Sequence, residues 1–136
     1  MPALDTNILV RYLVAGDTAQ LGAAKQLISR CVKEGLTLFV PVTVALELEW
    51  VLRSSFGLTK DDVMAALARL FSSAELRFES ERALEVALQL YREGSADFAG
   101  CLHVALAAQA GEQPLWTFDK AAAKVSGAQW LVAGQI

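Results

Sequence analysis

The sequence has few of the residues on which zinc sites and disulfides depend. It contains two cysteines, Cys31 and Cys101, and one histidine in 136 residues. The cysteines are far apart and stand in apolar, helix-like surroundings, whereas a zinc site needs several ligands at close spacing. We therefore expect buried thiols, no disulfide and no zinc held by sulfur.

Long apolar runs are also missing, and the first residues do not resemble a secretory signal. Hydrophobic residues make up 54% of the chain and the mean hydropathy is +0.38, yet the most apolar stretch, LFVPVTVALELEWVL, is interrupted by Pro41, Glu47 and Glu49. No run approaches the roughly 20 residues of a membrane-spanning helix, and the first residues lack the basic flank and cleavage site of a signal peptide. We expect a cytoplasmic protein that makes no membrane contact.

The spacing of apolar residues predicts alternating strands and helices. Strands are expected at 2–4, 37–40, 75–79, 114–118 and 128–132, and helices at 6–14, 17–35, 42–57, 59–74, 80–94, 97–111 and 119–125. Parallel strands need crossover connections, which these helices would supply. Without a linker or repeat, the pattern predicts one α/β domain over residues 1–136, with helices on both faces of a mainly parallel sheet of about five strands.

Two aspartates follow predicted strands. Asp5 in ALDTN and Asp119 in LWTFDK each stand where a strand ends and a helix begins. Either residue could simply cap its helix. Open α/β sheets, however, keep their ligands at the carboxyl edge of the strands, which is where both aspartates are expected to lie.

Two further acids belong to predicted helices. Asp97 opens a helix and could be only its cap. Glu47 stacks one turn beyond Thr43 and, at about 100° per residue, points about 200° away from Glu49. Glu49 and Arg53 form an i,i+4 pair typical of a solvated edge, so we expect Glu49 to face water and Glu47 to face inward. An inward carboxylate needs a basic partner or a cation, and at this point both explanations stay open.

Taken together, the four acids are predicted to converge at one edge of the sheet. Clustered carboxylates repel one another, so such a cluster is stable around cations, and all-oxygen ligands favour Mg²⁺ or Mn²⁺. A site of this kind performs phosphoryl chemistry. The net charge of −3 does not exclude a nucleic-acid partner, because without these four carboxylates the rest of the chain is net positive.

Four blocks of the sequence, by their order and spacing, resemble the PIN-domain ribonucleases, in particular the VapC-type toxins of toxin-antitoxin pairs. The blocks are ALDTNILVRYL, VTVALELEWVLR, DFAGCLHVALA and LWTFDK, and they span nearly the whole chain. Asn7 and Thr43 match polar positions beside the family's acidic quartet, and Thr117 lies on the strand that leads to the last acid. The residues that match the quartet itself are Asp5, Glu47, Asp97 and Asp119.

The resemblance implies a three-layer α/β/α sandwich, often a homodimer, that acts as a metal-dependent endoribonuclease and is held inactive by a small antitoxin. In that case Asp5 and Asp97 bind Mg²⁺ or Mn²⁺ directly. Glu47 and Asp119 bind through water or complete a second site. Cleavage of the RNA substrate leaves 5′-phosphate and 3′-hydroxyl ends.

Three residues near the acidic blocks affect the expected activity. Arg11 and Lys120 are candidates for holding RNA phosphates, although exposed basic residues on helices are usually only solvated. Gly100 stands where many relatives carry a further acid, which leaves the pocket with less charge and could weaken a second metal.

Other functions remain open on the sequence alone. A non-catalytic PIN-like domain that binds RNA or protein and a stand-alone RNA-processing nuclease are the alternatives. A receiver-type signalling domain is disfavoured, because it needs paired acids after the first strand and an aspartate after the third. Here the first strand offers one acid, and the segment ELRFE ends in Glu79.

Overall fold

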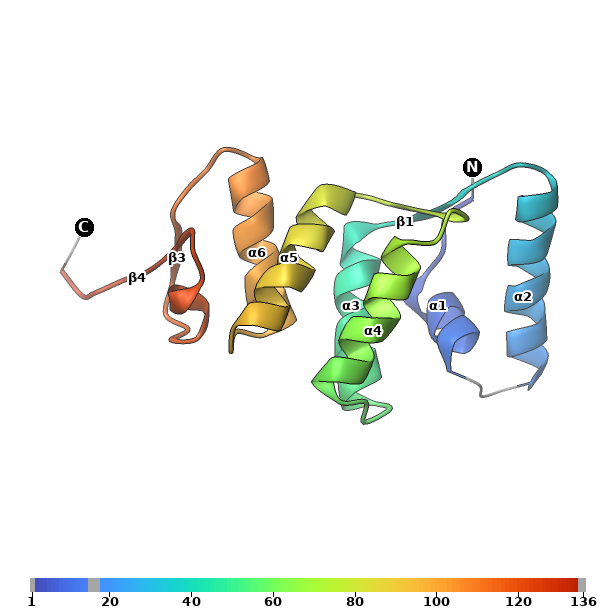
Figure 1. Ribbon diagram of the computed structural model, residues 1–136, viewed down its shortest axis with the longest axis horizontal. Helices are drawn as coiled ribbons and strands as arrows, with labels where there is room; N and C mark the ends of the chain where they lie inside the picture. The colour runs from blue at the N-terminus through green and yellow to red at the C-terminus, as the bar shows by residue number, and fades with distance from the viewer. Residues whose placement is uncertain (1, 15–17, 135–136) are drawn as a thin grey trace. The chain divides into compact units, whose positions relative to one another are not determined.

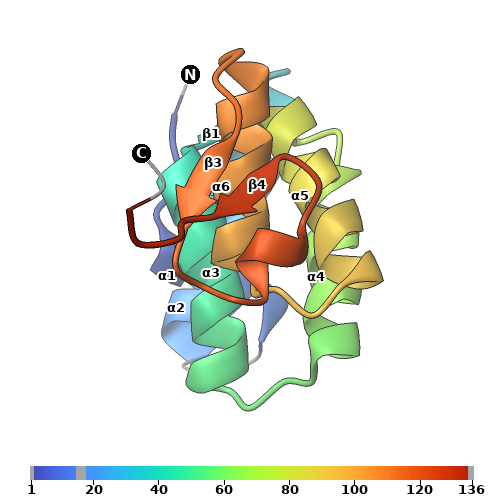
Figure 2. The same cartoon turned by 90° about the vertical axis from the view of Figure 1, so that its left-hand side faces the viewer.

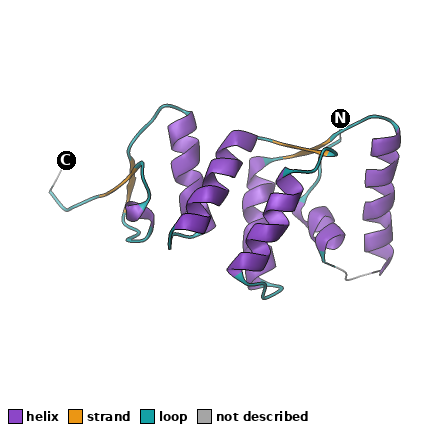
Figure 3. Ribbon diagram, in the orientation of Figure 1, coloured by secondary structure: helices purple, strands orange, loops and turns teal. Residues whose placement is uncertain are grey.

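The chain consists of two compact units, Met1–Glu81 and Arg82–Ile136, in a computed structural model that describes residues 2–14 and 18–134. The first unit contains α1 (Thr6–Leu13), α2 (Thr18–Lys33), β1 (Leu38–Val40), α3 (Val42–Ser54), α4 (Lys60–Phe71) and β2 (Leu76–Phe78) (Figures 1 and 3). The second unit contains nearly all of α5 (Glu81–Glu93), followed by α6 (Phe98–Gln109), β3 (Leu115–Thr117), the 3₁₀ helix η1 (Ala122–Lys124) and β4 (Ala128–Trp130).

Strand β1 is the centre of the sheet in the first unit. It pairs in parallel with β2, with Phe39 opposite Arg77. On its other side the amide of Phe39 donates to the carbonyl of Pro2 (2.8 Å), and the amide of Leu4 donates to the carbonyl of Phe39 (2.9 Å). The strand predicted at 2–4 is therefore present only as a parallel bridge at Ala3, and the residue that follows it is Asp5.

Two helices of the first unit, α1 and α4, begin at residues whose side chains cap them. The Asp5 side chain caps α1, and the Thr59 hydroxyl caps α4 by accepting from the Asp62 amide at 3.2 Å. Helix α1 contacts α2 and α3, and α3 contacts α4. The side chains that fill the core between these elements include Leu9, Leu38, Leu48, Leu52 and Leu67.

The second unit pairs β3 with β4 in parallel beside α6 (Figure 2). The edge strand predicted at 128–132 is confirmed over a shorter span, with Trp116 opposite Gln129. The helix predicted at 119–125 is reduced to the 3₁₀ helix η1, preceded by one i→i+4 bond from the Ala123 amide to the Asp119 carbonyl. The amides of Lys124 and Val125 instead donate to carbonyls three residues earlier.

The structure also tests the predictions about the cysteines, the direction of the strands and membrane-spanning helices. Cys31 and Cys101 are both buried thiols, as predicted. Every strand pair formed by residues 2–14 and 18–134 is parallel, which was also predicted. None of the helices described in these ranges is long and apolar enough to cross a bilayer.

Among the glycines that the structure describes, Gly127 has the strictest steric requirement. Its φ is +100°, and a methyl group placed on it would lie 2.8 Å from Gln113 Nε2 and 3.2 Å from Val104 Cγ1. We expect Gly127→Ala to lower the free energy of unfolding by about 1–3 kcal/mol, measured as a lower urea midpoint at unchanged slope.

Gly22→Ala is the matched control, because Gly22 lies within α2 and has no neighbour within 4 Å of an added methyl group. This substitution should stabilise the protein by about 0.5–1 kcal/mol. Equal midpoints for the two variants would show that β4 tolerates a side chain at Gly127.

Candidate active site

Asp5 is fixed at the start of α1 by the chain that follows it. Its Oδ1 accepts a hydrogen bond from the Thr6 amide at 2.7 Å, and the residue is exposed. The cap uses one carboxylate oxygen and leaves the second oxygen, Oδ2, without a hydrogen bond from the described residues. Capping and ligand binding are therefore compatible at Asp5.

Thr6 connects Asp5 to Glu47. Its amide donates to Asp5, and its hydroxyl donates to Glu47 Oε1 from across the interface of α1 and α3. Thr6 is 6% exposed, so the hydroxyl needs a partner inside the protein. Thr6 is not among the site residues predicted from the sequence. The available signal was a hydroxyl on the face of α1 that also carries Leu9 and Val10, where an unpaired polar group is costly.

The predicted orientations of Glu47 and Glu49 are wrong. Glu49 is 2% exposed and Glu47 is exposed. The buried stripe of α3 runs through Ala45, Leu48 and Leu52, and Glu49 lies one turn beyond Ala45 on that stripe. The predicted pair with Arg53 does form, with Arg53 Nε 2.9 Å from Glu49 Oε2. It neutralises a buried carboxylate and does not lie on a solvated edge of the helix as predicted.

A cavity of about 380 Å³ lies beside the two acids of the first unit. It is lined by Asp5, Thr6, Asn7, Val10, Arg11, Glu47, Val51, Ser55 and Phe56. Two other residues predicted from the sequence, Asn7 and Arg11, thus share a cavity with Asp5 and Glu47. Thr43 is exposed one turn earlier on α3 and is not among the residues that line it.

Asp97 and Asp119 are anchored in the second unit in the same way as Asp5. Asp97 caps α6, with Oδ1 accepting from the Gly100 amide at 2.8 Å. Asp119 Oδ1 accepts from the amides of Ala121 (2.9 Å) and Ala122 (3.1 Å). Both aspartates are exposed, so their remaining oxygens face solvent in their own unit.

Thr117 and Lys120 stand on either side of Asp119. The Thr117 hydroxyl accepts a hydrogen bond from the Asp119 amide at 2.9 Å, which ties the acid to the end of β3. Lys120 is exposed next to it. Thr117 therefore positions the turn on which Asp119 lies.

Gly100 lies between the turn that carries Asp97 and the turn that follows Asp119. A methyl group placed on Gly100 would lie 3.0 Å from Asp97 Oδ1 and 3.4 Å from the Cβ of Ala122, whose amide bonds to Asp119. The missing side chain thus permits both the capping bond of Asp97 and the close approach of η1.

The four acids share one pattern of hydrogen bonding. In each, one oxygen accepts from the protein, and the other accepts no hydrogen bond within residues 2–14 and 18–134. Carboxylates that are exposed and held through one oxygen suit a hard cation such as Mg²⁺ or Mn²⁺. In the described part of the chain, neither unit brings three candidate ligands together, and each carries two of the four acids.

Comparison with known proteins identifies the family. The model of the PIN domain matches residues 3–128, which include all four acids. A protein named VapC ribonuclease, from Aquifex aeolicus (strain VF5), is 23% identical over 120 residues, 88% of each chain. The PIN domain is a three-layer α/β/α fold, so the fold class predicted from the sequence is confirmed. The predicted sheet of about five strands is not, because in the described residues the strands pair only two by two, β1 with β2 and β3 with β4, and each has three residues. On this evidence the chain belongs to the PIN-domain family.

Proposed function

We propose that this protein is a metal-dependent endoribonuclease whose four carboxylates form one site. The observation that carries the proposal is the shared anchoring of Asp5, Glu47, Asp97 and Asp119, each with one oxygen held and one available. Membership of the PIN-domain family and the similarity to a VapC ribonuclease support it. The family match covers both units, which supports a single PIN-like domain over residues 1–136.

Each carboxylate has a separate role in this proposal. Asp5 and Asp97 hold Mg²⁺ or Mn²⁺ directly, while Glu47 and Asp119 bind through water or complete a second site and orient the attacking water. The bound cation supplies activation of that water and neutralises charge on the phosphate oxygens. Thr6 positions Glu47 by donating to its carboxylate, and Thr117 positions Asp119 by accepting from its amide.

The residues around the carboxylates contact the RNA in this proposal. Asn7 and Thr43 are polar groups beside the acids, and Arg11 and Lys120 hold phosphates of the substrate strand. Cations at these positions would offset repulsion between the RNA and the acidic centre. The products would carry 5′-phosphate and 3′-hydroxyl ends.

We further propose that the protein is the toxin of a toxin-antitoxin pair and acts in the cytoplasm. A cognate antitoxin would bind it and block cleavage, and the active form would be a homodimer. The support is the similarity to a protein named VapC ribonuclease over 88% of both chains. A stand-alone RNA-processing nuclease would have the same chemistry without an antitoxin.

The decisive test is cleavage of a mixed pool of tRNA and ribosomal RNA fragments by the purified protein. Cleavage is expected with Mg²⁺ or Mn²⁺, is abolished by EDTA and returns when the metal is restored in excess. Mapping of the new ends should find 5′-phosphates, because the attacking group is water and not the ribose 2′-hydroxyl.

Two results would count against the proposal. Cleavage that survives EDTA and leaves 2′,3′-cyclic phosphates would indicate metal-independent chemistry. RNA binding without cleavage under all metal conditions would favour the non-catalytic PIN-like domain, an alternative motivated by Gly100, where many relatives carry a further acid.

A further inference from the structure

The cavity beside Asp5 and Glu47 extends well beyond these two acids. On α3 its lining continues from Glu47 through Val51 to Ser55, and each step is one helical turn. At a rise of about 1.5 Å per residue, the lining spans about 12 Å along α3. The cavity is therefore longer than the space that a single phosphate group needs, and its volume of about 380 Å³ is typical of a site for a small organic group.

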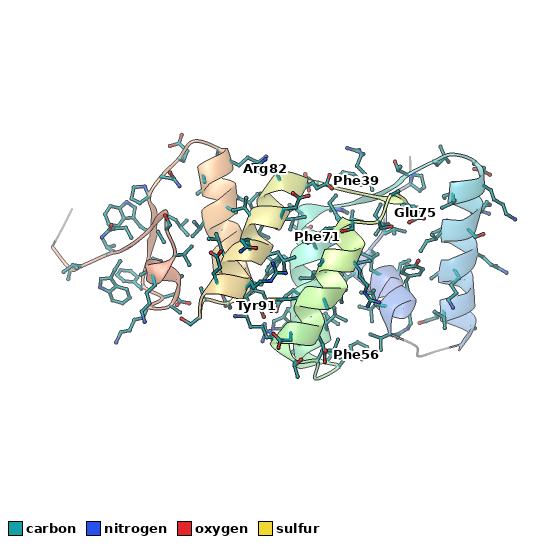
Figure 4. All side chains as sticks on the ribbon, in the orientation of Figure 1. Phe39, Phe56, Phe71, Glu75, Arg82 and Tyr91 are labelled. Carbon is teal, nitrogen blue, oxygen red and sulfur yellow. The ribbon has the colours of Figure 1, made fainter. Side chains whose placement is uncertain are left out.

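Phe56 lies at the far end of this cavity, in the turn after α3 (Figure 4). It is 39% exposed, and its ring has no aromatic or cationic partner among the described residues. The turn that carries it is held in place, because the Leu58 amide donates to the Leu52 carbonyl at 3.1 Å and Gly57 adopts a φ of +64°. A partly exposed aromatic side chain, carried on a hydrogen-bonded turn, thus lines the cavity.

The polar lining complements a nucleotide. The Arg11 guanidinium engages the described residues only through Nε, which donates to Gln20 Oε1 at 2.7 Å, so most of its five N–H donors remain for a ligand. The Ser55 hydroxyl makes no hydrogen bond to the described residues and is exposed. Val10 and Val51 supply apolar wall between these groups.

We propose that the groove between α1 and the C-terminal half of α3, from Arg11 to Phe56, is a nucleotide subsite for the RNA strand. The base of a nucleotide neighbouring the cleaved bond stacks on Phe56, and its phosphate pairs with Arg11. Aromatic rings bind unpaired bases by stacking, and this interaction tolerates any base. The inference rests on the proposed function, because Phe56 would position the RNA substrate of the same active site.

The test measures binding separately from cleavage. Asp119→Asn serves as the parent, because Asp119 is not among the residues that line the groove and its loss should stop cleavage while RNA is bound. The probe is a short, fluorescein-labelled single-stranded RNA of mixed sequence, followed by anisotropy in Mn²⁺. Adding Phe56→Leu, which keeps apolar bulk and removes the aromatic face, should weaken binding by on the order of tenfold, and Phe56→Tyr should restore it.

Tyr12→Leu is the matched control. Tyr12 is an aromatic residue on the neighbouring α1, 42% exposed, and it lines a different cavity. Its substitution should leave RNA binding unchanged. In the cleaving protein, Phe56→Leu should raise KM about tenfold with little change in kcat, as expected for a contact made before and during the reaction.

The salt dependence of RNA binding distinguishes the contribution of Arg11 from that of Phe56. Arg11→Gln should reduce the slope of log K against log salt by about 0.7, because one phosphate contact to a single strand is lost. Phe56→Leu should leave that slope unchanged, because stacking releases no counterion.

The outcomes distinguish this inference from the proposed function. If RNA binds the parent but Phe56→Leu binds as tightly as the parent, the subsite is overturned and the nuclease is not. If Phe56→Leu weakens binding although the wild-type protein never cleaves, the subsite stands on a non-catalytic RNA-binding domain. If the parent binds no RNA, both proposals fail, and the groove then belongs to another occupant, such as a protein partner.

Discussion

Asp5→Asn and Asp97→Asn should each lower the rate of RNA cleavage by about a thousandfold without unfolding the protein. Removing one direct ligand charge costs several kcal/mol of transition-state stabilisation, and about 4 kcal/mol corresponds to that factor. Folding should survive because asparagine is as good an N-cap as aspartate and its Oδ1 can accept the same amide bonds. The measurement is single-turnover cleavage together with a thermal unfolding curve for each variant.

The double variant tests whether acids from the two units act on one cation. If Asp5 and Asp97 bind the same metal, losing the second ligand after the first should cost little more, because groups that act as a unit are strongly non-additive. Mn²⁺ affinity is measured alongside cleavage, so that the single and double variants can still be compared when their cleavage rates reach the detection limit. If the fold-losses of the two single variants multiply in the double variant, the two acids belong to separate sites.

Asp61→Asn is the matched control for loss of charge. Asp61 is an exposed acid in the first turn of α4, in the same unit as Asp5. It should leave cleavage and Mn²⁺ affinity unchanged. A large loss in this control would mean that general electrostatics, and not ligation, explains the effect of the Asp5 substitution.

Thr6→Val should lower cleavage and Mn²⁺ affinity by about 10- to 100-fold, the usual effect of removing a group that orients metal ligands. Valine keeps the shape of threonine but cannot donate to Glu47, so the Glu47 carboxylate loses the bond that holds it near Asp5. The amide cap of Asp5 should be unaffected, because it comes from the main chain of residue 6.

Thr6→Ser provides the control, since serine keeps the hydroxyl and removes only a methyl group. Metal affinity should return close to the wild-type value, even though some packing is lost at a residue that is 6% exposed. A serine variant as weak as the valine variant would assign Thr6 a packing role and remove it from the positioning of Glu47.

The N-caps and parallel pairings could be predicted because they depend on local sequence. Asp5 and Asp97 both cap helices that begin where apolar periodicity starts, and the strands at 37–40, 75–79, 114–118 and 128–132 pair in parallel as expected. Burial at Glu47 and Glu49 could not be predicted in the same way. Glu47 and Glu49 belong to the same helix, and which of them is buried depends on which face of that helix packs against the core. The pair of Glu49 with Arg53 can form whether Glu49 is buried or exposed, so it does not indicate burial.

Thr6 was missed for a related reason. Its role depends on Glu47, which lies in a different helix, and no local pattern marks a hydroxyl as the partner of a distant carboxylate. The convergence of all four acids is a similar case, because Asp5 and Glu47 belong to one unit and Asp97 and Asp119 to the other. It stays a prediction that the double variant tests.

The anchoring of the four carboxylates also has a consequence for the order in which a refolding chain acquires them. The bonds that fix Asp5, Asp97 and Asp119 span at most three residues, so each aspartate is set as soon as its own turn forms. The bond from Thr6 to Glu47 spans 41 residues and requires closure of the chain between α1 and α3. A partly folded chain would therefore carry its aspartates already oriented and acquire Glu47 last.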